Sequence, residues 1–227
     1  MHNKSKTILD LCGGTGSWSR PYEEEGYDVR IITLPVYDVT QTEFMEDRMV
    51  FKNDASPCES WMVVYYNEVY GVLAAPPCTE FSVLNCIAAP RERDEVAGME
   101  VVNACLKIIE RCAPKFWALE NPVGYLRKHM PNPKLTFQPW WYGDGWTKRT
   151  DIWGNFNIPE RTYKDWDDVP KIDIYTRPGR GKPNFAFLHK SAQQNIPQLK
   201  GIPVASDAEF RAITPPGFAK AFYEANK

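Results

Sequence analysis

The chain has 227 residues, of which 43% are hydrophobic and 25% charged, and its formal net charge is −2. This composition is typical of a globular domain with a sizeable core, and it excludes a disordered chain or one that binds nucleic acid through overall positive charge. Because no apolar run approaches the roughly 18 residues of a membrane span and no signal peptide is evident, we expect a single cytoplasmic domain over residues 1–227.

The N-terminal segment predicts a strand, a glycine-rich turn and a helix. Residues 7–11 are apolar and lead into the turn at 13–16, after which residues 17–24 have a helical pattern that ends at Gly26. A second strand, rich in β-branched residues, is expected over 27–34. Together these segments predict a βαβ unit near the N-terminus.

The middle of the chain alternates between apolar runs and one long amphipathic segment. Residues 49–51 and 61–66 are compatible with a hairpin, and a buried strand is expected over 72–75. A helix is predicted over 95–112, followed by another buried strand over 116–119. The apolar residues that define one face of that helix are Val101, Cys105, Ile108, Ile109 and Cys112.

Two of the buried strands lead into polar residues beside prolines. Cys78 follows a Pro-Pro pair, and Glu120-Asn121 precedes a proline. Ligands and catalytic groups gather at the carboxyl ends of strands in open α/β sheets. We therefore expect Asp10, Cys78, Glu120 and Asn121 at one edge of the sheet. Taken separately, each motif has a simpler interpretation. Pro-Pro-Cys can be a strand terminator with a buried thiol, and Glu-Asn-Pro can be only a turn.

The six cysteines contain no CxxC pair, which argues against a zinc site, and a cytoplasmic location argues against disulfides. For any cysteine taken alone, a small buried hydrophobic residue is the alternative to a chemical role. The cysteines are Cys12, Cys58, Cys78, Cys86, Cys105 and Cys112.

The glycine-rich turn differs from the common phosphate-binding loops. It has neither the Lys-Ser/Thr of a Walker loop nor the full GxGxxG spacing of a dinucleotide site, so a tight turn is one interpretation. In the other, Asp10 holds the loop, and close backbone approach at Gly14 and Gly16 suits a flat, nucleoside-like cofactor.

Cys78 and Glu120 together suit one particular reaction. A thiol at a strand end before a helix N-terminus is expected to have a lowered pKa and to act as a nucleophile. None of the three histidines lies in a motif-like context, which argues against a cysteine protease. A thiolate that adds to C6 of a pyrimidine, with a protonated carboxyl group hydrogen-bonded to N3, makes C5 a carbon nucleophile.

Three motifs in order resemble those of the S-adenosylmethionine-dependent DNA C5-cytosine methyltransferases. They are DLCGGTGSW at 10–18, APPCTEFS at 75–82 and ENPVGYL at 120–126, and the similarity in spacing covers residues 7–155. ITPPGFAKAF near the end resembles the last cofactor-side helix of compact, phage-type members. The resemblance implies an α/β, Rossmann-like methyltransferase fold with a mostly parallel central sheet flanked by helices.

The resemblance also implies roles for individual residues. Cys78 is the nucleophile, Glu120 is the acid that binds N3, and Asn121 helps to order the strand end. Because relatives that methylate an amino group carry an aromatic residue after the Pro-Pro pair, Cys78 implies that C5 of cytosine is the target, in a base flipped out of DNA. S-adenosylmethionine is expected to contact Asp10, Leu11, Cys12, Gly13, Gly14, Thr15, Gly16, Trp18 and Pro76, while Pro77 shapes the catalytic loop.

Two departures from the family pattern leave assignments open. The second strand of the family usually ends in an acid that binds the cofactor ribose, whereas here Asp38 is the nearest acidic replacement. The family motif Gln-x-Arg-x-Arg after a Tyr-Gly pair is also altered, so Lys148 or Arg149 is expected to supply the cation. The positions that match this motif are Trp146, Lys148 and Thr150, with Arg149 one place out of register.

The segment at about 159–203 is rich in Pro, Gly and basic residues, and it stands where larger members carry a target-recognition domain. Arg177, Arg180 and Lys182 either clamp phosphate or belong to a solvated surface loop. We therefore expect low or short sequence specificity, or help from a second protein chain. The alternatives are the same chemistry on a free cytosine nucleotide, single-stranded DNA or RNA, transfer of a group other than methyl, and a non-catalytic protein that binds DNA or a partner.

Overall fold

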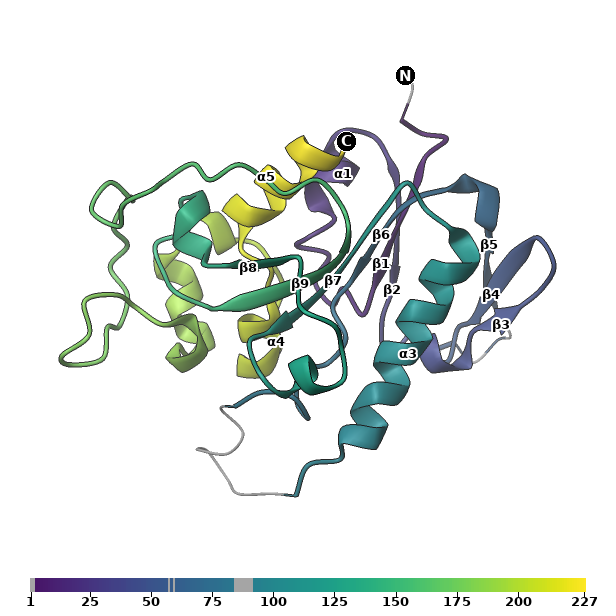
Figure 1. The fold of residues 1–227 in the computed structure, drawn as a ribbon, viewed down its shortest axis with the longest axis horizontal. Helices are drawn as coiled ribbons and strands as arrows, with labels where there is room; N and C mark the ends of the chain where they lie inside the picture. Colours follow the sequence, from purple (N-terminus) through teal and green to yellow (C-terminus); the bar gives the residue numbers. More distant parts are fainter. Residues whose placement is uncertain (1–2, 57, 59, 84–91) are drawn as a thin grey trace.

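A computed structural model describes residues 3–56, 58, 60–83 and 92–227. Within them, a central sheet has the strand order β2-β1-β6-β7-β9-β8, and a smaller sheet has the order β3-β4-β5 (Figure 1). The central strands are β1 Thr7–Leu11, β2 Asp28–Ile32, β6 Val69–Ala74, β7 Phe116–Pro122, β8 Leu135–Phe137 and β9 Thr150–Asn155. The smaller sheet contains β3 Glu43–Phe44, β4 Arg48–Lys52 and β5 Trp61–Tyr65. The α-helices are α1 Arg20–Glu24, α3 Glu95–Cys112, α4 Asp207–Ala212 and α5 Pro216–Asn226.

The central sheet is mixed. Strands β2, β1, β6 and β7 run parallel to one another, whereas β9 runs antiparallel to both β7 and β8. The α/β class is therefore confirmed, but the sheet is only partly parallel. The sheet is less parallel than expected because β9 pairs antiparallel with both β7 and β8. Antiparallel neighbours such as β8 and β9 can be joined without the crossover helix that a parallel pair needs.

Alternate side chains of the central strands face two separate layers. Leu9, Leu11 and Val72 belong to one hydrophobic cluster with α3 and the smaller sheet. Ile8 and Leu73 belong to a second cluster with α1 and α5. This is the period of two expected of strands that are covered on both faces. Figure 1 shows α1 beside α5, and α3 apart from them.

Most of the elements predicted in the first half of the chain are present. The βαβ unit, the hairpin of β4 and β5 and the helix over 95–112 are confirmed. The strand predicted from residue 72 begins earlier, at Val69. The strand predicted over 116–119 continues through Glu120 and Asn121 to Pro122, because these residues pair with β9 after the pairing with β6 has ended. Strands β3, β8 and β9 were not predicted.

Helix α3 has the local signals that begin and end a helix. The side chain of Asp94 accepts a hydrogen bond from the amide of Ala97 at 2.9 Å, and Ala113 ends the helix in a left-handed conformation with φ of 43°. Val102 is fully buried, whereas Val101, which was expected on the buried face, is half-buried. No helix in the described part of the chain is both long and apolar enough to cross a membrane.

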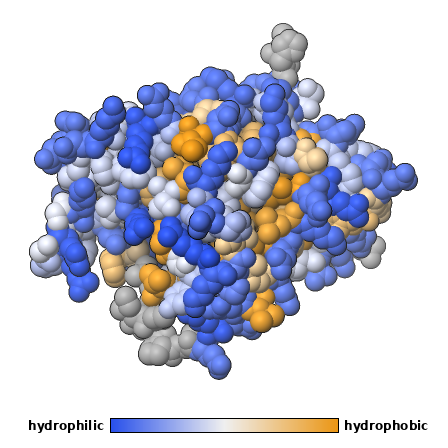
Figure 2. Space-filling view, viewed as in Figure 1, coloured by the Kyte–Doolittle hydropathy of each residue, from blue (hydrophilic) through white to orange (hydrophobic). Residues whose placement is uncertain are grey.

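The segment at 159–203 contains short 3₁₀ helices and packs on a hydrophobic cluster that it shares with α4. The apolar side chains of this segment are therefore packed in a small core of their own. The surface of the molecule seen in Figure 2 is largely hydrophilic. The buried members of this cluster are Trp146, Phe185, Leu188, Ile196, Leu199, Ile202, Phe210 and Ile213.

Candidate active site

The glycine-rich turn wraps around a buried carboxyl group. Asp10 is fully buried near the end of β1, and its Oδ2 atom accepts a hydrogen bond of 2.5 Å from the hydroxyl of Ser19. Its Oδ1 atom has no hydrogen-bond partner among the described residues. A Cβ atom at Gly13 would lie 2.2 Å from Cγ of Asp10, so the turn needs glycine at this position.

Burial determines the protonation of this carboxyl group. It raises the pKa of Asp10 from its ordinary 3.8 to about 6, although the hydrogen bonds from Ser19 oppose the rise. Asp10 is therefore a buried carboxyl group with one free acceptor, which can pair with a ligand cation or donor.

The conformation of the turn depends on residues with positive φ. Gly14 and Gly16 have φ of 54° and 67°, and Cys12 adopts φ of 57° without being a glycine. Such a conformation in a non-glycine residue is costly and is found preferentially at functional sites.

The C-terminal helix lies against this turn. The ring of Trp18 is 6.1 Å from that of Phe218 and 5.4 Å from that of Phe222, both on α5. The amide of Thr214 donates a hydrogen bond of 2.9 Å to the hydroxyl of Ser17. The ITPPGFAKAF segment is therefore packed beside the residues expected to hold a cofactor.

A cavity of about 830 Å³ opens at the carboxyl ends of the parallel strands. Asp10, Cys78 and Glu120 all lie in its wall, because β1, β6 and β7 are adjacent in the sheet. The predicted site residues that line it are Asp10, Cys12, Gly13, Gly14, Thr15, Trp18, Pro76, Cys78, Glu120 and Lys148. Those that do not are Leu11, Gly16, Asp38, Asn121 and Arg149.

Cys78 lies in a turn that follows β6. Its carbonyl accepts hydrogen bonds from the amides of Phe81 and Ser82 at 3.0 and 2.8 Å. Burial raises the pKa of the Cys78 thiol; the charge of Lys148 opposes this and that of Glu120 adds to it. The expected lowering of the pKa is therefore wrong, because burial outweighs the cations, and the described residues 79–83 form turns and an isolated bridge instead of the start of a helix.

Glu120 is paired with a cation inside the same cavity. The Nζ atom of Lys148 is 3.9 Å from Oε1 of Glu120, and these side chains are only 11% and 12% exposed, respectively. Burial raises the pKa of Glu120, and the negative charge of Asp151 adds to the rise while Lys148 opposes it. Glu120 is therefore more easily protonated than an exposed glutamate.

Asn121 connects the two strand ends from behind the cavity. It is fully buried, and its Nδ2 atom donates a hydrogen bond of 3.0 Å to the carbonyl of Pro76. Because Pro76 lies two residues before Cys78, this bond holds the loop that carries Cys78 against β7. Asn121 is therefore placed to order the strand end rather than to touch a ligand.

The structure separates the two candidate cations. Lys148 lines the cavity, and its amide donates a hydrogen bond of 3.2 Å to the side chain of Gln138. Arg149 is exposed and lies outside the cavity. Of these two neighbours, Lys148 is the one that borders the cavity.

No acid occupies the cavity wall next to β2. Thr33 and Leu34 line it there, whereas Asp38 lies outside and accepts hydrogen bonds from the amide and hydroxyl of Thr40 at 2.9 and 2.7 Å.

Leu11 is buried in the α3 cluster, and a Cβ atom at Gly16 would lie 2.6 Å from Cδ1 of Ile31. Leu11 and Gly16 therefore shape the turn without lining the cavity.

Several lining residues come from parts of the chain that sequence reasoning did not connect with the site. Arg211 on α4 is one of them, and its charge makes a small contribution that lowers the pKa of Cys78. The Ser-x-x-Glu pattern at 206–209 could have predicted the start of α4, where the Ser206 hydroxyl accepts from the amide of Glu209 at 3.1 Å. The same pattern could not have predicted that α4 forms part of the wall of this cavity. The other unpredicted lining residues include Thr33, Leu34, Phe187, Glu209 and Thr214.

The cysteines in the described residues are all free thiols, and Cys86 lies outside those residues. Among the residues with a described position, no three His, Cys, Asp or Glu side chains gather in a way that could hold a metal ion.

No protein-family model matches the chain, and the search of curated proteins finds no relative. A function for the chain must therefore be argued from the cavity and from the motifs that line it.

Proposed function

We propose that the chain is an S-adenosylmethionine-dependent DNA cytosine-C5 methyltransferase with a Rossmann-like fold. The main support is that Cys78 and Glu120, 42 positions apart in the sequence, line one cavity with the glycine-rich turn around Asp10. A thiol and a carboxyl group that favours its protonated form are the two groups that activation of a cytosine ring requires.

The residues of the turn fit the proposed cofactor. The free Oδ1 atom of Asp10 can accept from a cationic ligand group, while Gly14, where an added Cβ atom would have no neighbour within 4 Å, allows close backbone approach. Trp18, Thr33 and Leu34 complete this side of the wall. S-adenosylmethionine, when bound, supplies a methyl group attached to a positively charged sulfur.

The side chains of this chain activate the base. The Cys78 thiolate forms a bond to C6 of cytosine while Glu120 gives its proton to N3, so that the ring becomes an enamine with a nucleophilic C5. After C5 has gained the methyl group, water in the cavity takes the C5 proton. The electron pair of that C–H bond re-forms the C5–C6 double bond, the sulfur leaves as thiolate, and the N3 proton returns to Glu120.

The charges around Cys78 explain how a buried thiol reaches its reactive form. Lys148 and Arg211 both lower the pKa of Cys78, whereas an ionised Glu120 raises it. A protonated Glu120 therefore assists both steps: it removes a negative charge near the sulfur and supplies the proton for N3.

Methyl transfer to DNA tests the proposal directly. With labelled S-adenosylmethionine and a cytosine-containing duplex, the wild-type protein is expected to form 5-methylcytosine. Cys78→Ala should abolish the product, and Glu120→Gln should lower the rate by about 10²- to 10⁴-fold because it removes the acid. Cys58→Ala, which removes an exposed thiol outside the cavity, is the matched control and should leave the rate unchanged.

The covalent intermediate can be detected separately. An oligonucleotide with fluorine at C5 of the target cytosine has no C5 proton to lose, so the bond between sulfur and C6 should persist after methyl transfer. Mass spectrometry should place the adduct on the peptide that contains Cys78. Full turnover by Cys78→Ala, or an adduct on another cysteine, would show that the nucleophile is wrongly assigned.

The same chemistry on a free cytosine nucleotide is the second candidate. The net charge of −2 and the small size of the 159–203 segment favour it, because neither provides a large DNA-binding surface. Rates measured with dCMP, single strands and duplexes at equal cytosine concentration distinguish the two candidates.

A further inference from the structure

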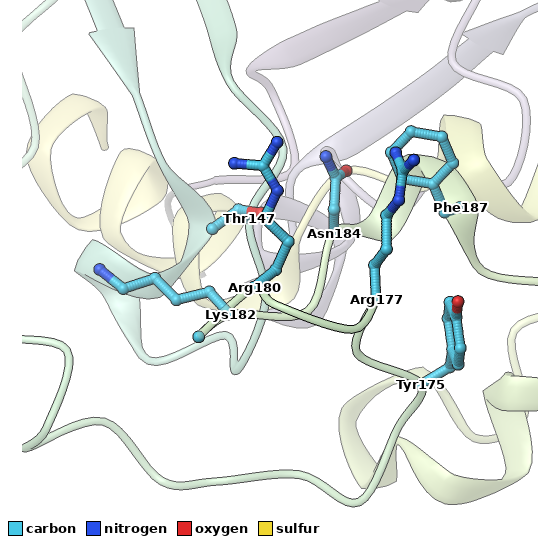
Figure 3. Close-up of a pocket in the computed structure, with 8 residues that line it drawn as sticks. Thr147, Tyr175, Arg177, Arg180, Lys182, Asn184 and Phe187 are labelled. Carbon is cyan, nitrogen blue, oxygen red and sulfur yellow. The ribbon is translucent and has the colours of Figure 1, made fainter.

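A second pocket, of about 570 Å³, adjoins the first and lies in the 159–203 segment (Figure 3). It opens on the surface, and Phe187 lines both cavities. Its main lining side chains are Tyr175, Arg177, Arg180, Lys182, Asn184 and Phe187. None of the described residues that line it is acidic.

A tight turn brings two arginines to this pocket. The amide of Arg180 donates a hydrogen bond of 3.0 Å to the carbonyl of Arg177. Between them, Pro178 and Gly179, with φ of 76° at the glycine, match the preferences of a type II turn. Figure 3 shows both arginine side chains extending to the same side of the loop, while the Lys182 side chain points away from them.

The arginines have no acidic partner among the described residues. Neither forms an ion pair with a carboxylate in the described part of the chain, and both are exposed. Lys182 differs, because its Nζ atom lies 4.5 Å from the ring centre of Trp140 and 5.2 Å from that of Trp166. Two neighbouring guanidinium groups without an acidic partner form a site suited to phosphate.

Two aromatic rings complete the pocket. Tyr175 and Phe187 are 60% and 45% exposed, which leaves ring surface free for contact with a base. The guanidinium of Arg177 lies 6.0 Å from the ring centre of Phe187. Cationic side chains interleaved with aromatic rings are the common means of holding a nucleic-acid strand without reading its sequence.

Backbone hydrogen bonds attach this pocket to the proposed active site. The amide of Thr147 donates to the carbonyl of Pro183 at 2.8 Å, and the amide of Phe185 donates to the carbonyl of Thr147 at 3.0 Å. Thr147 precedes Lys148, the cation that faces Glu120. A ligand in the second pocket is therefore held in a set position relative to the cavity that contains Cys78.

From these observations we infer that the second pocket binds a nucleotide adjacent to the target cytosine on a DNA strand. Arg177 and Arg180 contact the phosphate, and Tyr175 and Phe187 stack on the base. The inference rests on the proposed function and deepens it: the substrate is a polynucleotide rather than a free nucleotide. Because phosphate contacts and stacking tolerate any sequence, this pocket adds affinity without specificity.

Salt-dependent binding of a labelled, cytosine-containing DNA oligonucleotide tests this site. We expect the double variant R177A/R180A to bind about ten- to a hundredfold more weakly at low salt, as for the loss of charged hydrogen bonds. The slope of log K against log[salt] should fall in magnitude by about 1.5 to 2, corresponding to two lost phosphate contacts. Lys200→Ala, an exposed cation of the same segment outside both cavities, should bind like wild type.

The outcomes separate this inference from the proposed function. If R177A/R180A binds DNA like wild type while methyl transfer proceeds, the second pocket is wrongly assigned and the enzyme assignment stands. If DNA binding depends on the two arginines but no methyl transfer occurs, the proposed function fails while the DNA site stands. Methylation of dCMP as fast as of DNA, or tighter binding of RNA than of DNA, would overturn the inference.

The double variant also needs a test of folding. Both arginine side chains are exposed, so the thermal unfolding midpoint and the affinity for S-adenosylhomocysteine should match those of wild type. The variant R177K/R180K keeps both charges and should recover most of the salt slope, although not the bidentate geometry of arginine. If R177K/R180K recovered none of the salt dependence of DNA binding, the proposed contact of Arg177 and Arg180 with phosphate would be contradicted.

Discussion

At the scale of single residues, the charges around Cys78 control its reactivity. Burial raises the pKa of the thiol, and Lys148 and Arg211 are the cations that oppose the rise. The free protein therefore favours a protonated thiol, and in the proposed reaction the formation of the thiolate depends on charges that lie inside the cavity. This is a different route to a thiolate from the helix N-terminus that the sequence suggested.

Replacing Lys148 tests this electrostatic account. Lys148→Met should raise the pKa of Cys78 and slow its alkylation by iodoacetamide, which follows the thiolate fraction. Below the pKa, a rise of one in the pKa makes alkylation about tenfold slower. The rate can be measured from pH 7 to pH 10 by mass spectrometry of the peptide that contains Cys78.

Arg149→Met is the matched control, because Arg149 is the adjacent residue but is exposed and outside the cavity. Its alkylation profile should follow that of the wild type. Equal slowing in both variants would indicate a general charge effect and would contradict the placement of Lys148 beside the thiol.

At the scale of elements, the turn after β1 is shaped by close contact with Asp10. Gly13 lies against the carboxyl group, while Gly14 and Gly16 adopt positive φ. The sequence indicated a tight turn at this place, but the reason for glycine differs between positions. At Gly13 the reason is space, and at Gly14 it is backbone conformation.

Gly13→Ala should therefore destabilise the protein. The new Cβ atom would lie 2.2 Å from Cγ of Asp10, so the turn must shift. We expect a loss of about 1–3 kcal/mol in the free energy of unfolding, as for other overpacked sites, and a weaker affinity for S-adenosylhomocysteine. Urea unfolding followed by tryptophan fluorescence, together with calorimetric titration, measures both effects.

Gly181→Ala serves as the control for stability. A Cβ atom added at Gly181 would have no neighbour within 4 Å, and the residue has no positive φ, so the stability should change by less than about 0.5 kcal/mol. If Gly13→Ala and Gly181→Ala lowered the free energy of unfolding by similar amounts, Gly13 would not be in tight contact with the carboxyl group of Asp10.

At the scale of the whole molecule, a buried carboxyl group ties the C-terminal helix to the rest of the fold. Oδ1 of Asp144 accepts a hydrogen bond of 3.2 Å from the amide of Gly217, at the start of α5. Burial raises the pKa of Asp144 from 3.8 to about 7, although hydrogen bonds from the amides of Gly217 and Phe218 oppose the rise. Ionisation of this group therefore affects the stability of the entire fold.

The sign of the effect follows from the raised pKa of Asp144. Between about pH 4 and pH 7 the folded chain keeps a proton that the unfolded chain has released, so stability falls as the pH rises through this window. The loss contributed by this one group is on the order of 4 kcal/mol. Asp144→Asn should remove this part of the pH dependence while keeping the acceptor for Gly217.

Urea unfolding at several pH values between 4.5 and 8.5 measures this difference. The stability of Asp144→Asn relative to wild type should increase with pH across the window, whereas that of Asp173→Asn, a change at an exposed carboxylate, should stay constant. Parallel curves for Asp144→Asn and wild type would show that Asp144 does not titrate with a raised pKa.

The parts of the fold that could be predicted are those with local signals. The βαβ unit follows from its apolar runs and the glycines between them, and α3 follows from the helical spacing of its apolar residues. Strands β8 and β9 gave no comparable signal, because β8 has only three residues and β9 is held by its pairing with β7, which lies far from it in the sequence. The end of β7 was misplaced for the same reason: Pro122 follows polar residues that would end an isolated strand but here pair with β9.

The sequence by itself determined the chemical types present: a thiol after a Pro-Pro pair, a carboxyl group before Asn121, and a glycine-rich turn after the first strand. Local residue order is sufficient for such motifs. Only the tertiary structure decided that Cys78, Glu120 and Lys148 share one cavity, that Arg211 joins them and that Arg149 does not. These relations depend on strand order and on the packing of α4, which are long-range contacts that no local pattern records.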